Sequence, residues 1–303
     1  RSGRVTGVQT CALPISGTQV AAEIRAELKE KTAKLKADKG VVPGLVILRV
    51  GEDPASVSYV KGKEKACDEV GIYQETIVYP DDVDEKTVLD KLVELNNDPK
   101  YHGILVQLPL PKHISEDKVI DIIDPRKDVD GFHPVNVGKL LIGNPYFMPC
   151  TPAGIQQLLV RSGNDPAGKH VVICGRSNIV GKPILAIMLQ KKDGANATVT
   201  MVHTGTKDAA SVTRQADILI AAVGRPKVIT ADMVKEGVVV IDVGVNRVPD
   251  DTKKSGFRLV GDTDFEAIKE KAKAITPVPG GVGPMTITML MWNTVNAAES
   301  ASA

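Results

Sequence analysis

The chain alternates between segments with a helical spacing of apolar residues and short, almost continuous apolar runs. Val20, Ile24 and Leu28 recur every four residues, and the apolar run GLVILRV at 44–50 follows them. Helices that alternate with buried strands are typical of βαβ units, in which parallel strands are connected through helices packed on the sheet. The pattern therefore predicts an α/β fold.

The alternation forms two series that meet near residues 145–155. The first series has strands at 44–50, 75–79 and 103–111, with helices at 56–71 and 84–97. The second series has strands at 170–177, 197–203, 216–224 and 238–245, and a last helix at 286–298. Thr151 is the predicted N-cap of the helix that opens the second series, because Pro152 follows it at the first helical position.

We predict two α/β domains around a cleft, the second a Rossmann-like dinucleotide-binding domain. The catalytic domain is expected to span 17–150, with the C-terminal helix 284–303 packing back on it, and the dinucleotide-binding domain 151–283. Residues 1–16, RSGRVTGVQTCALPIS, show neither helical nor strand periodicity and no apolar run of a secretory signal. We interpret them as a non-native or disordered leader. A mitochondrial presequence is the alternative, because the segment has no acidic residue.

Charge and residue usage exclude several classes of protein. Lysine and arginine number 38 against 37 acidic residues, which leaves no basic excess for nucleic acid or an anionic membrane. The apolar runs are shorter than the roughly 20 residues that cross a bilayer. The four cysteines form no CxxC pair and the five histidines no ligand cluster. We predict a cytoplasmic protein without a metal site.

The segment CGRSNIVGKP has the form of a dinucleotide-binding turn. Gly175 follows a predicted strand and Gly181 opens a helix, whose N-terminal N–H groups suit a pyrophosphate. Ser177 replaces the usual middle glycine, and an ordinary strand-to-helix turn is the alternative. Three further buried strands favour the cofactor site. Its predicted cofactor-binding residues, at this turn and the neighbouring strand ends, are Gly175, Arg176, Ser177, Ile179, Val180, Gly181, His203, Thr204, Val223, Gly224 and Val243.

The identity of the dinucleotide is predicted from the end of the next strand. NAD enzymes usually place an acidic residue there to bind the ribose hydroxyls, whereas this chain has His203 and Thr204. Arg176 carries a planar guanidinium that suits a 2′-phosphate. We therefore predict NADP as the cofactor. A solvated loop charge is the alternative explanation of Arg176.

Tyr59 and Lys63 lie one turn apart on the helix at 56–71, so they share a side of it. Gln107 is a polar residue inside the apolar run GILVQLPLP, and a buried amide requires hydrogen-bond partners. The ends of parallel strands gather at one edge, so Gln107 is expected to hold Lys63. A solvated lysine beside a half-buried tyrosine is the alternative.

Two further segments are candidates for the same site. Asp128 and Asp130, in RKDVDGFHP, supply carboxylates, although an acidic turn that only caps local backbone is the alternative. The glycine-rich run TPVPGGVGPMT lets backbone approach a flat ligand closely, unless it is a plain linker. Its candidate substrate-binding residues are Pro279, Gly280 and Gly281.

The motifs YVKGK, GILVQLPLP, KDVDGFHPVNVGKL, CGRSNIVGKP and TPVPGGVGPMT occur together in this order. Together they closely resemble the bifunctional methylenetetrahydrofolate dehydrogenase/methenyltetrahydrofolate cyclohydrolase family, over about residues 18–298. The chain departs from that family at its start, where PISGTQ stands in place of a short first strand.

The resemblance implies roles for individual residues. By it, Lys63 is the cyclohydrolase lysine, Gln107 positions it, and Tyr59 packs on the folate. It likewise makes Asp130 the pterin anchor and places Ser56 next to the site. Arg176 and Ser177 correspond to contacts with the cofactor phosphates.

The resemblance also implies a reaction and an assembly. A homodimer is expected to oxidise 5,10-methylenetetrahydrofolate with NADP and to hydrolyse the methenyl product to 10-formyltetrahydrofolate. The neutral amine of a desolvated lysine suits the proton transfer of the second step. A dehydrogenase without hydrolase activity and a catalytically silent nucleotide-binding subunit remain alternatives.

Overall fold

The computed structural model describes residues 12–253 and 255–302. The chain divides into two compact units. We call Thr18–Gly154 with the segment from Pro284 onward the amino-terminal unit. Residues 12–17 with Ile155–Gly283 form the carboxyl-terminal unit. The two compact units part between Gly154 and Ile155, and the domain bounds expected from the sequence stay a prediction.

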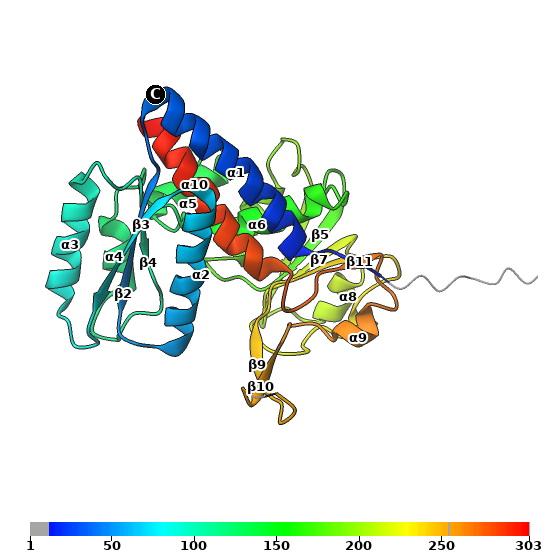
Figure 1. The fold of residues 1–303 in the computed structure, drawn as a ribbon. Helices are drawn as coiled ribbons and strands as arrows, with labels where there is room; N and C mark the ends of the chain where they lie inside the picture. The colour runs from blue at the N-terminus through cyan, green and yellow to red at the C-terminus, as the bar shows by residue number, and fades with distance from the viewer. Residues whose placement is uncertain (1–11, 254, 303) are drawn as a thin grey trace, which may run out of the picture. The chain divides into compact units, whose positions relative to one another are not determined.

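The amino-terminal unit is built on a parallel sheet of order β3-β2-β4, visible in Figure 1. Its strands are β2 (Gly44–Val50), β3 (Tyr73–Tyr79) and β4 (Gly103–Val106). Every residue of β2 is buried, because elements cover both faces of this central strand. The carboxyl ends of β2 and β4 therefore lie side by side at one edge.

Helices cover the two faces of this sheet. On one face, α3 (Glu85–Asn97) and α4 (Glu116–Ile122) share a buried apolar cluster with β2 and β4. Beyond the other, α2 (Pro54–Val70) meets α10 (Val282–Ala301) where the Cys67 and Met291 sulfur atoms lie 3.4 Å apart. The C-terminal helix thus packs within the amino-terminal unit.

The remaining helices of this unit are α1 (Gly17–Lys39) and α5 (Pro134–Leu141). Helix α1 runs parallel to α10, to which it is joined by hydrogen bonds from Arg25 to Thr288 and from Lys31 to Asn296. The parallel direction follows from the order of these pairs along both helices.

The carboxyl-terminal unit contains a six-stranded sheet of order β1-β11-β8-β7-β5-β6, in which all pairings are parallel. Its strands are β1 (Leu13–Pro14), β5 (His170–Cys174), β6 (Thr198–Val202), β7 (Ile218–Ala221), β8 (Val239–Asp242) and β11 (Ala274–Ile275). The chain moves outward from β5 to β6 and then returns to the other side at β7. This reversal of strand order is the place where such sheets bind ligands.

Helices and a hairpin complete the carboxyl-terminal unit (Figure 1). The helices are α6 (Cys150–Arg161), whose residues 150–154 belong to the amino-terminal unit, α7 (Gly181–Met188), α8 (Ala209–Thr213), the 3₁₀ turn η1 (Ala231–Met233) and α9 (Phe265–Ile268). An antiparallel hairpin joins β9 (Asn246–Pro249) to β10 (Phe257–Val260). Its first strand starts four residues after β8.

Two expectations from the sequence are wrong. Leu13 and Pro14 form β1 and pair with Ala274 and Ile275, although their segment shows no strand periodicity. A two-residue strand is too short to have a period, and its partner lies about 260 residues away in sequence. The rest of the predicted leader, residues 1–11, lies outside the described residues. Thr151 is not an N-cap either, since α6 already begins at Cys150.

Candidate functional site

The amino-terminal unit brings Lys63 and Gln107 together. Helix α2 begins directly after β2, where the Asp53 carboxylate accepts a hydrogen bond of 2.8 Å from the Ser56 N–H. Two turns along, Lys63 Nζ donates to Gln107 Oε1 at 2.9 Å. The predicted contact between Gln107 and Lys63 is therefore confirmed, although Gln107 is half-buried and follows the last residue of β4.

The Gln107 side chain is oriented by its own surroundings. Its backbone N–H extends the β4 pairing by donating to Leu48 O at 2.8 Å, and its Nε2 donates to Leu108 O at 2.7 Å. Because the amide nitrogen is engaged, the carbonyl oxygen faces the Lys63 amine. An acceptor held in this way suits either protonation state of a lysine.

Two more ionisable groups lie around Lys63. Burial lowers the pKa of Lys63, and the nearby Asp130 and Cys150 oppose that shift only partly. Burial likewise raises the pKa of Asp130, against the effect of Lys63 and of a hydrogen bond with Cys150. Burial also raises the pKa of the Cys150 thiol well above its ordinary value. Burial in this site therefore shifts the amine, the carboxyl and the thiol toward their uncharged forms.

The two acidic residues of RKDVDGFHP have different roles. The buried Asp128 carboxylate accepts hydrogen bonds from the N–H groups of Gly131 and His133, at 3.1 and 2.8 Å, and from Asn136 Nδ2 at 2.8 Å. Asp128 thus shapes its own turn, as the alternative explanation held. Asp130 is the carboxylate whose negative charge raises the pKa of Lys63.

Sequence reasoning missed two residues of this site. The sequence indicated no role for Cys150, but the residue is buried and contacts Asp130. Asn293, on α10, donates from Nδ2 to Val129 O at 2.8 Å and to Met148 O at 2.9 Å. It therefore fixes the backbone beside both Asp130 and Cys150. An asparagine in the apolar run TITMLMWNTV was the available signal.

Tyr59 and Ser56 lie on the first turns of the same helix. The Tyr59 side chain is 52% exposed, one turn before Lys63, whereas Ser56 is buried. An exposed aromatic ring beside a buried amine offers a surface on which a flat ligand can stack.

The predicted cofactor residues all follow strands of the carboxyl-terminal unit at the same edge of its sheet. They occupy the ends of β5, β6, β7 and β8. Gly175 has φ +119°, and a Cβ there would lie 2.1 Å from the Ala222 carbonyl oxygen. A Cβ on Gly181 would lie 2.3 Å from Gly175 O. Only glycine fits at these two positions, and the turn leads into the N-terminus of α7, an end of a helix that suits a pyrophosphate.

Ser177, which replaces the usual middle glycine of the motif, stabilises the turn. Ser177 Oγ accepts hydrogen bonds from the N–H groups of Val180 and Gly181, at 3.1 and 3.3 Å. Arg176 is exposed, and no ion pair of the described residues engages it. At the end of β6, His203 Nδ1 accepts from Gly205 N–H at 3.0 Å. These groups fit a phosphorylated dinucleotide, although their binding roles stay predictions.

Pro279, Gly280 and Gly281 lie in the segment between β11 and α10, within the carboxyl-terminal unit. Their predicted contact with substrate stays a prediction, as does the cleft expected from the sequence. Among residues 12–253 and 255–302, no group of three His, Cys, Asp or Glu side chains could hold a metal ion. No helix in that part of the chain is long and apolar enough to span a bilayer.

Comparisons with known proteins agree with both halves of this description. Residues 15–130 match the family model for the catalytic domain of tetrahydrofolate dehydrogenase/cyclohydrolase. Residues 149–302 match the model for its NAD(P)-binding domain. A curated relative from Syntrophus aciditrophicus, called bifunctional protein FolD, is 62% identical over 288 residues, which cover 95% of this chain and 98% of the relative.

Solved structures give the same result. The bifunctional FolD methylenetetrahydrofolate dehydrogenase/cyclohydrolase from Campylobacter jejuni is 47% identical with a TM-score of 0.89, over 96% of this chain and 99% of that one. The Trypanosoma brucei enzyme, solved with NADP and an inhibitor, is 39% identical with a TM-score of 0.90 over the same shares. With both domain models matched in order and identities well above 30% along nearly the whole length, this chain belongs to the tetrahydrofolate dehydrogenase/cyclohydrolase family.

Proposed function

We propose that this chain oxidises 5,10-methylenetetrahydrofolate with NADP and then hydrolyses the methenyl product to 10-formyltetrahydrofolate. The observation that carries the proposal is the buried Lys63 amine held 2.9 Å from Gln107 Oε1, with Asp130 beside it. A dehydrogenase alone has no use for such an amine. The relatives named above support the same pair of activities, and one of them was solved with NADP.

For the first step, NADP held by the carboxyl-terminal unit would supply the hydride acceptor for the bridge carbon of the folate. The chain supplies orientation, since the folate nitrogens themselves stabilise the resulting cation. The turn between Gly175 and Gly181 holds the pyrophosphate, and Arg176 the 2′-phosphate. In the amino-terminal unit, Tyr59 packs on the folate ring and Asp130 anchors the pterin.

In the second step, water attacks the methenyl carbon. Neutral Lys63 accepts a proton from that water as the carbon–oxygen bond forms. The bond between this carbon and N5 then breaks while the hydroxyl proton passes to N5 and the carbonyl forms, which leaves the formyl group on N10. Lys63 gives its proton to solvent, so one proton is released overall. Gln107 holds the amine in place by accepting one of its hydrogens.

A spectrophotometric assay with 5,10-methylenetetrahydrofolate tests the proposal. Purified protein should reduce NADP and release 10-formyltetrahydrofolate. NADPH formation with accumulating methenyl product would instead indicate a dehydrogenase without hydrolase activity. Binding of NADP without any folate-dependent change in absorbance would indicate a silent subunit.

The hydrolysis rate should depend on pH through Lys63. The neutral amine is the active form, so kcat should rise with pH through the pKa of Lys63 and then level off. Because burial lowers this pKa, the rise should lie below the ordinary lysine range. The pH–kcat profile of methenyltetrahydrofolate hydrolysis measures it. A rise that persists in Lys63→Met would show that another group titrates.

The cofactor preference should depend on Arg176. We expect a higher kcat/KM with NADP than with NAD, and Arg176→Ala should lower the NADP value about 10- to 100-fold, as expected for loss of a charged hydrogen bond. NAD serves as the internal control, because it lacks the 2′-phosphate. Equal losses with both cofactors, or a preference for NAD in the wild type, would contradict the assignment.

The family resemblance also supports a homodimer and a cytoplasmic location, which we retain as parts of this proposal.

A further inference from the structure

A pair of buried aspartates ties together the loops that follow β7 and β8. The Asp262 side chain is fully buried. Its Oδ2 accepts hydrogen bonds from the backbone N–H groups of Val223 and Gly224, at 2.7 and 2.9 Å. Its Oδ1 accepts from Asn246 Nδ2 at 2.9 Å. Asp262 therefore fixes the second and third residues of the loop that leaves β7.

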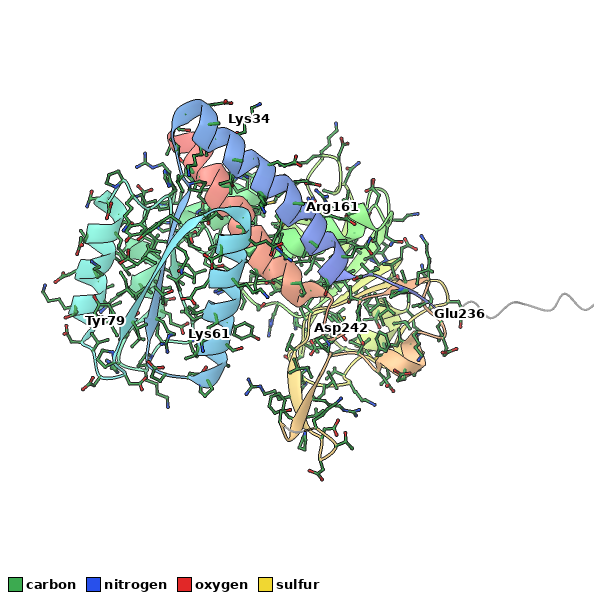
Figure 2. The ribbon with its side chains drawn as sticks, in the orientation of Figure 1. Lys34, Lys61, Tyr79, Arg161, Glu236 and Asp242 are labelled. Carbon is green, nitrogen blue, oxygen red and sulfur yellow. The ribbon has the colours of Figure 1, made fainter. Side chains whose placement is uncertain are left out.

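Asp242, the last residue of β8 and labelled in Figure 2, in turn fixes Asp262. Its Oδ1 accepts from the N–H groups of Gly244 and Asp262, at 3.0 and 2.9 Å. Its Oδ2 accepts from both the N–H and the hydroxyl of Thr263, at 2.9 and 2.6 Å. A Cβ on Gly244 would lie 2.1 Å from Asp262 Oδ1, so the carboxylate occupies that side-chain space.

These two carboxylates are surrounded by donors but not by cations. Every contact described for them is an N–H or O–H that points at a carboxylate oxygen, which is the pattern of ionised acceptors. Burial raises the pKa of Asp242, and the hydrogen bonds from Thr263 and its neighbours oppose that shift. Within the described part of the chain neither aspartate forms an ion pair. Their negative charge is thus not cancelled locally.

The sheet order determines which half of a dinucleotide meets this pair. The glycine turn follows β5, at the reversal of strand order, and the end of β6 is where the ribose of the adenosine half lies in such folds. The other half must extend to the opposite side of β5, over the ends of β7 and β8. That is the edge formed by Val223, Gly224 and Val243.

We propose that Asp262, held by Asp242, positions the Val223–Gly224 loop against the nicotinamide half of NADP, and that its charge favours the oxidised, cationic ring over the reduced, neutral ring. The inference rests on the proposed function, because it takes NADP as the ligand. After hydride transfer the ring is neutral and loses this attraction, which favours release of the reduced cofactor.

The substitution Asp262→Asn removes the negative charge of Asp262 while it keeps the hydrogen bonds that position the Val223–Gly224 loop. The new side chain keeps an oxygen for the N–H groups of Val223 and Gly224, and its amide can face Asn246 if the Asn246 amide flips. We expect the Kd for NADP⁺ to rise about tenfold, the effect of one charge across roughly 10 Å at an effective dielectric constant near 20. The Kd for NADPH should change less than about threefold, because its uncharged ring has no charge–charge attraction to Asp262. Both constants are measured by titration calorimetry on the full chain.

Asp217→Asn is the matched control. Asp217 lies before β7, at the other edge of the same sheet, where its Oδ2 accepts from His170 N–H at 2.9 Å. Its replacement should leave both constants unchanged. Equal weakening of NADP⁺ and NADPH by Asp262→Asn would show a structural role only and would overturn the inference. Wild-type protein that binds neither cofactor would instead refute the proposed function.

A thermal melt shows whether Asp262→Asn folds. If it does not fold, the proposal can still be tested on the wild type. The NADP analogue with a carbon-linked benzamide has a neutral ring of nearly the same shape. It should bind the wild type about tenfold more weakly than NADP⁺, by the same charge effect. Equal affinity for the two would mean that the protein does not sense the charge of the ring.

Discussion

Replacement of Lys63 by methionine is expected to lower the hydrolysis of methenyltetrahydrofolate about 10³-fold, while the oxidation of methylenetetrahydrofolate falls less than about fivefold. The hydrolysis loss is the usual contribution of a positioned general base, and methionine keeps the length and packing of the side chain without a proton acceptor. Hydride transfer needs no protein base, so it should largely survive. Separate assays of the two steps on the purified variant measure both rates.

Lys61→Met is the control for this variant. Lys61 lies on the same helix two residues earlier and is exposed, and it is labelled in Figure 2. The same substitution there should leave both rates close to those of the wild type. Equal retention of both activities in Lys63→Met would refute the role of Lys63. Parallel loss of both would indicate that methionine disturbs folate binding rather than proton transfer.

The contact between Lys63 and Gln107 was predictable, because a polar residue within an apolar run requires a hydrogen-bond partner. Gln107 stands within such a run, directly after β4 ends, and its half-buried amide requires a partner there. The strand order of a parallel sheet then places that partner near the end of β2, where α2 carries Lys63. The ambiguity between Asp128 and Asp130 was not resolvable in this way. Both stand in one turn, and only the fold shows that Asp128 turns back on its own backbone.

Other features depend on partners distant in sequence. Asn293 supports the backbone beside Asp130 from a helix more than 160 residues further along the chain. Strand β1 exists only because β11 offers it an edge. The division of the chain falls inside α6, since an apolar helical stripe does not tell which of two cores it joins. Asp262 reads as an ordinary loop acid, because nothing local shows that it is buried, whereas Asp242 stands inside the apolar run 238–245.

The dinucleotide turn was predictable as a motif, but the reason for its first glycine appears only in the packing. At Gly175 the strand end passes so close to the end of β7 that a Cβ would lie 2.1 Å from the Ala222 carbonyl oxygen. That oxygen belongs to backbone between two buried strands and cannot move aside cheaply. The residue also adopts φ +119°, which side chains rarely allow.

Gly175→Ala is therefore expected to destabilise the protein by about 4 kcal/mol, the sum of a steric overlap and a backbone strain of about 1–3 kcal/mol each. The melting temperature should fall by about 10 °C. NADP binding should be lost over the accessible concentration range, because relief of the overlap moves the N–H groups of the turn. Denaturant unfolding and cofactor titration measure the two effects.

Gly163→Ala separates the effect of backbone strain from that of steric overlap. Gly163 lies in the same unit and also has a positive φ, +72°, but no atom stands within 4 Å of its missing Cβ. We expect it to cost only the backbone strain, about 1 kcal/mol, with NADP binding unchanged. If both variants are equally stable and bind NADP alike, the approach of β5 to Ala222 is not what requires glycine. If Gly175→Ala alone loses both properties, close contact between the ends of β5 and β7 is what shapes the cofactor turn.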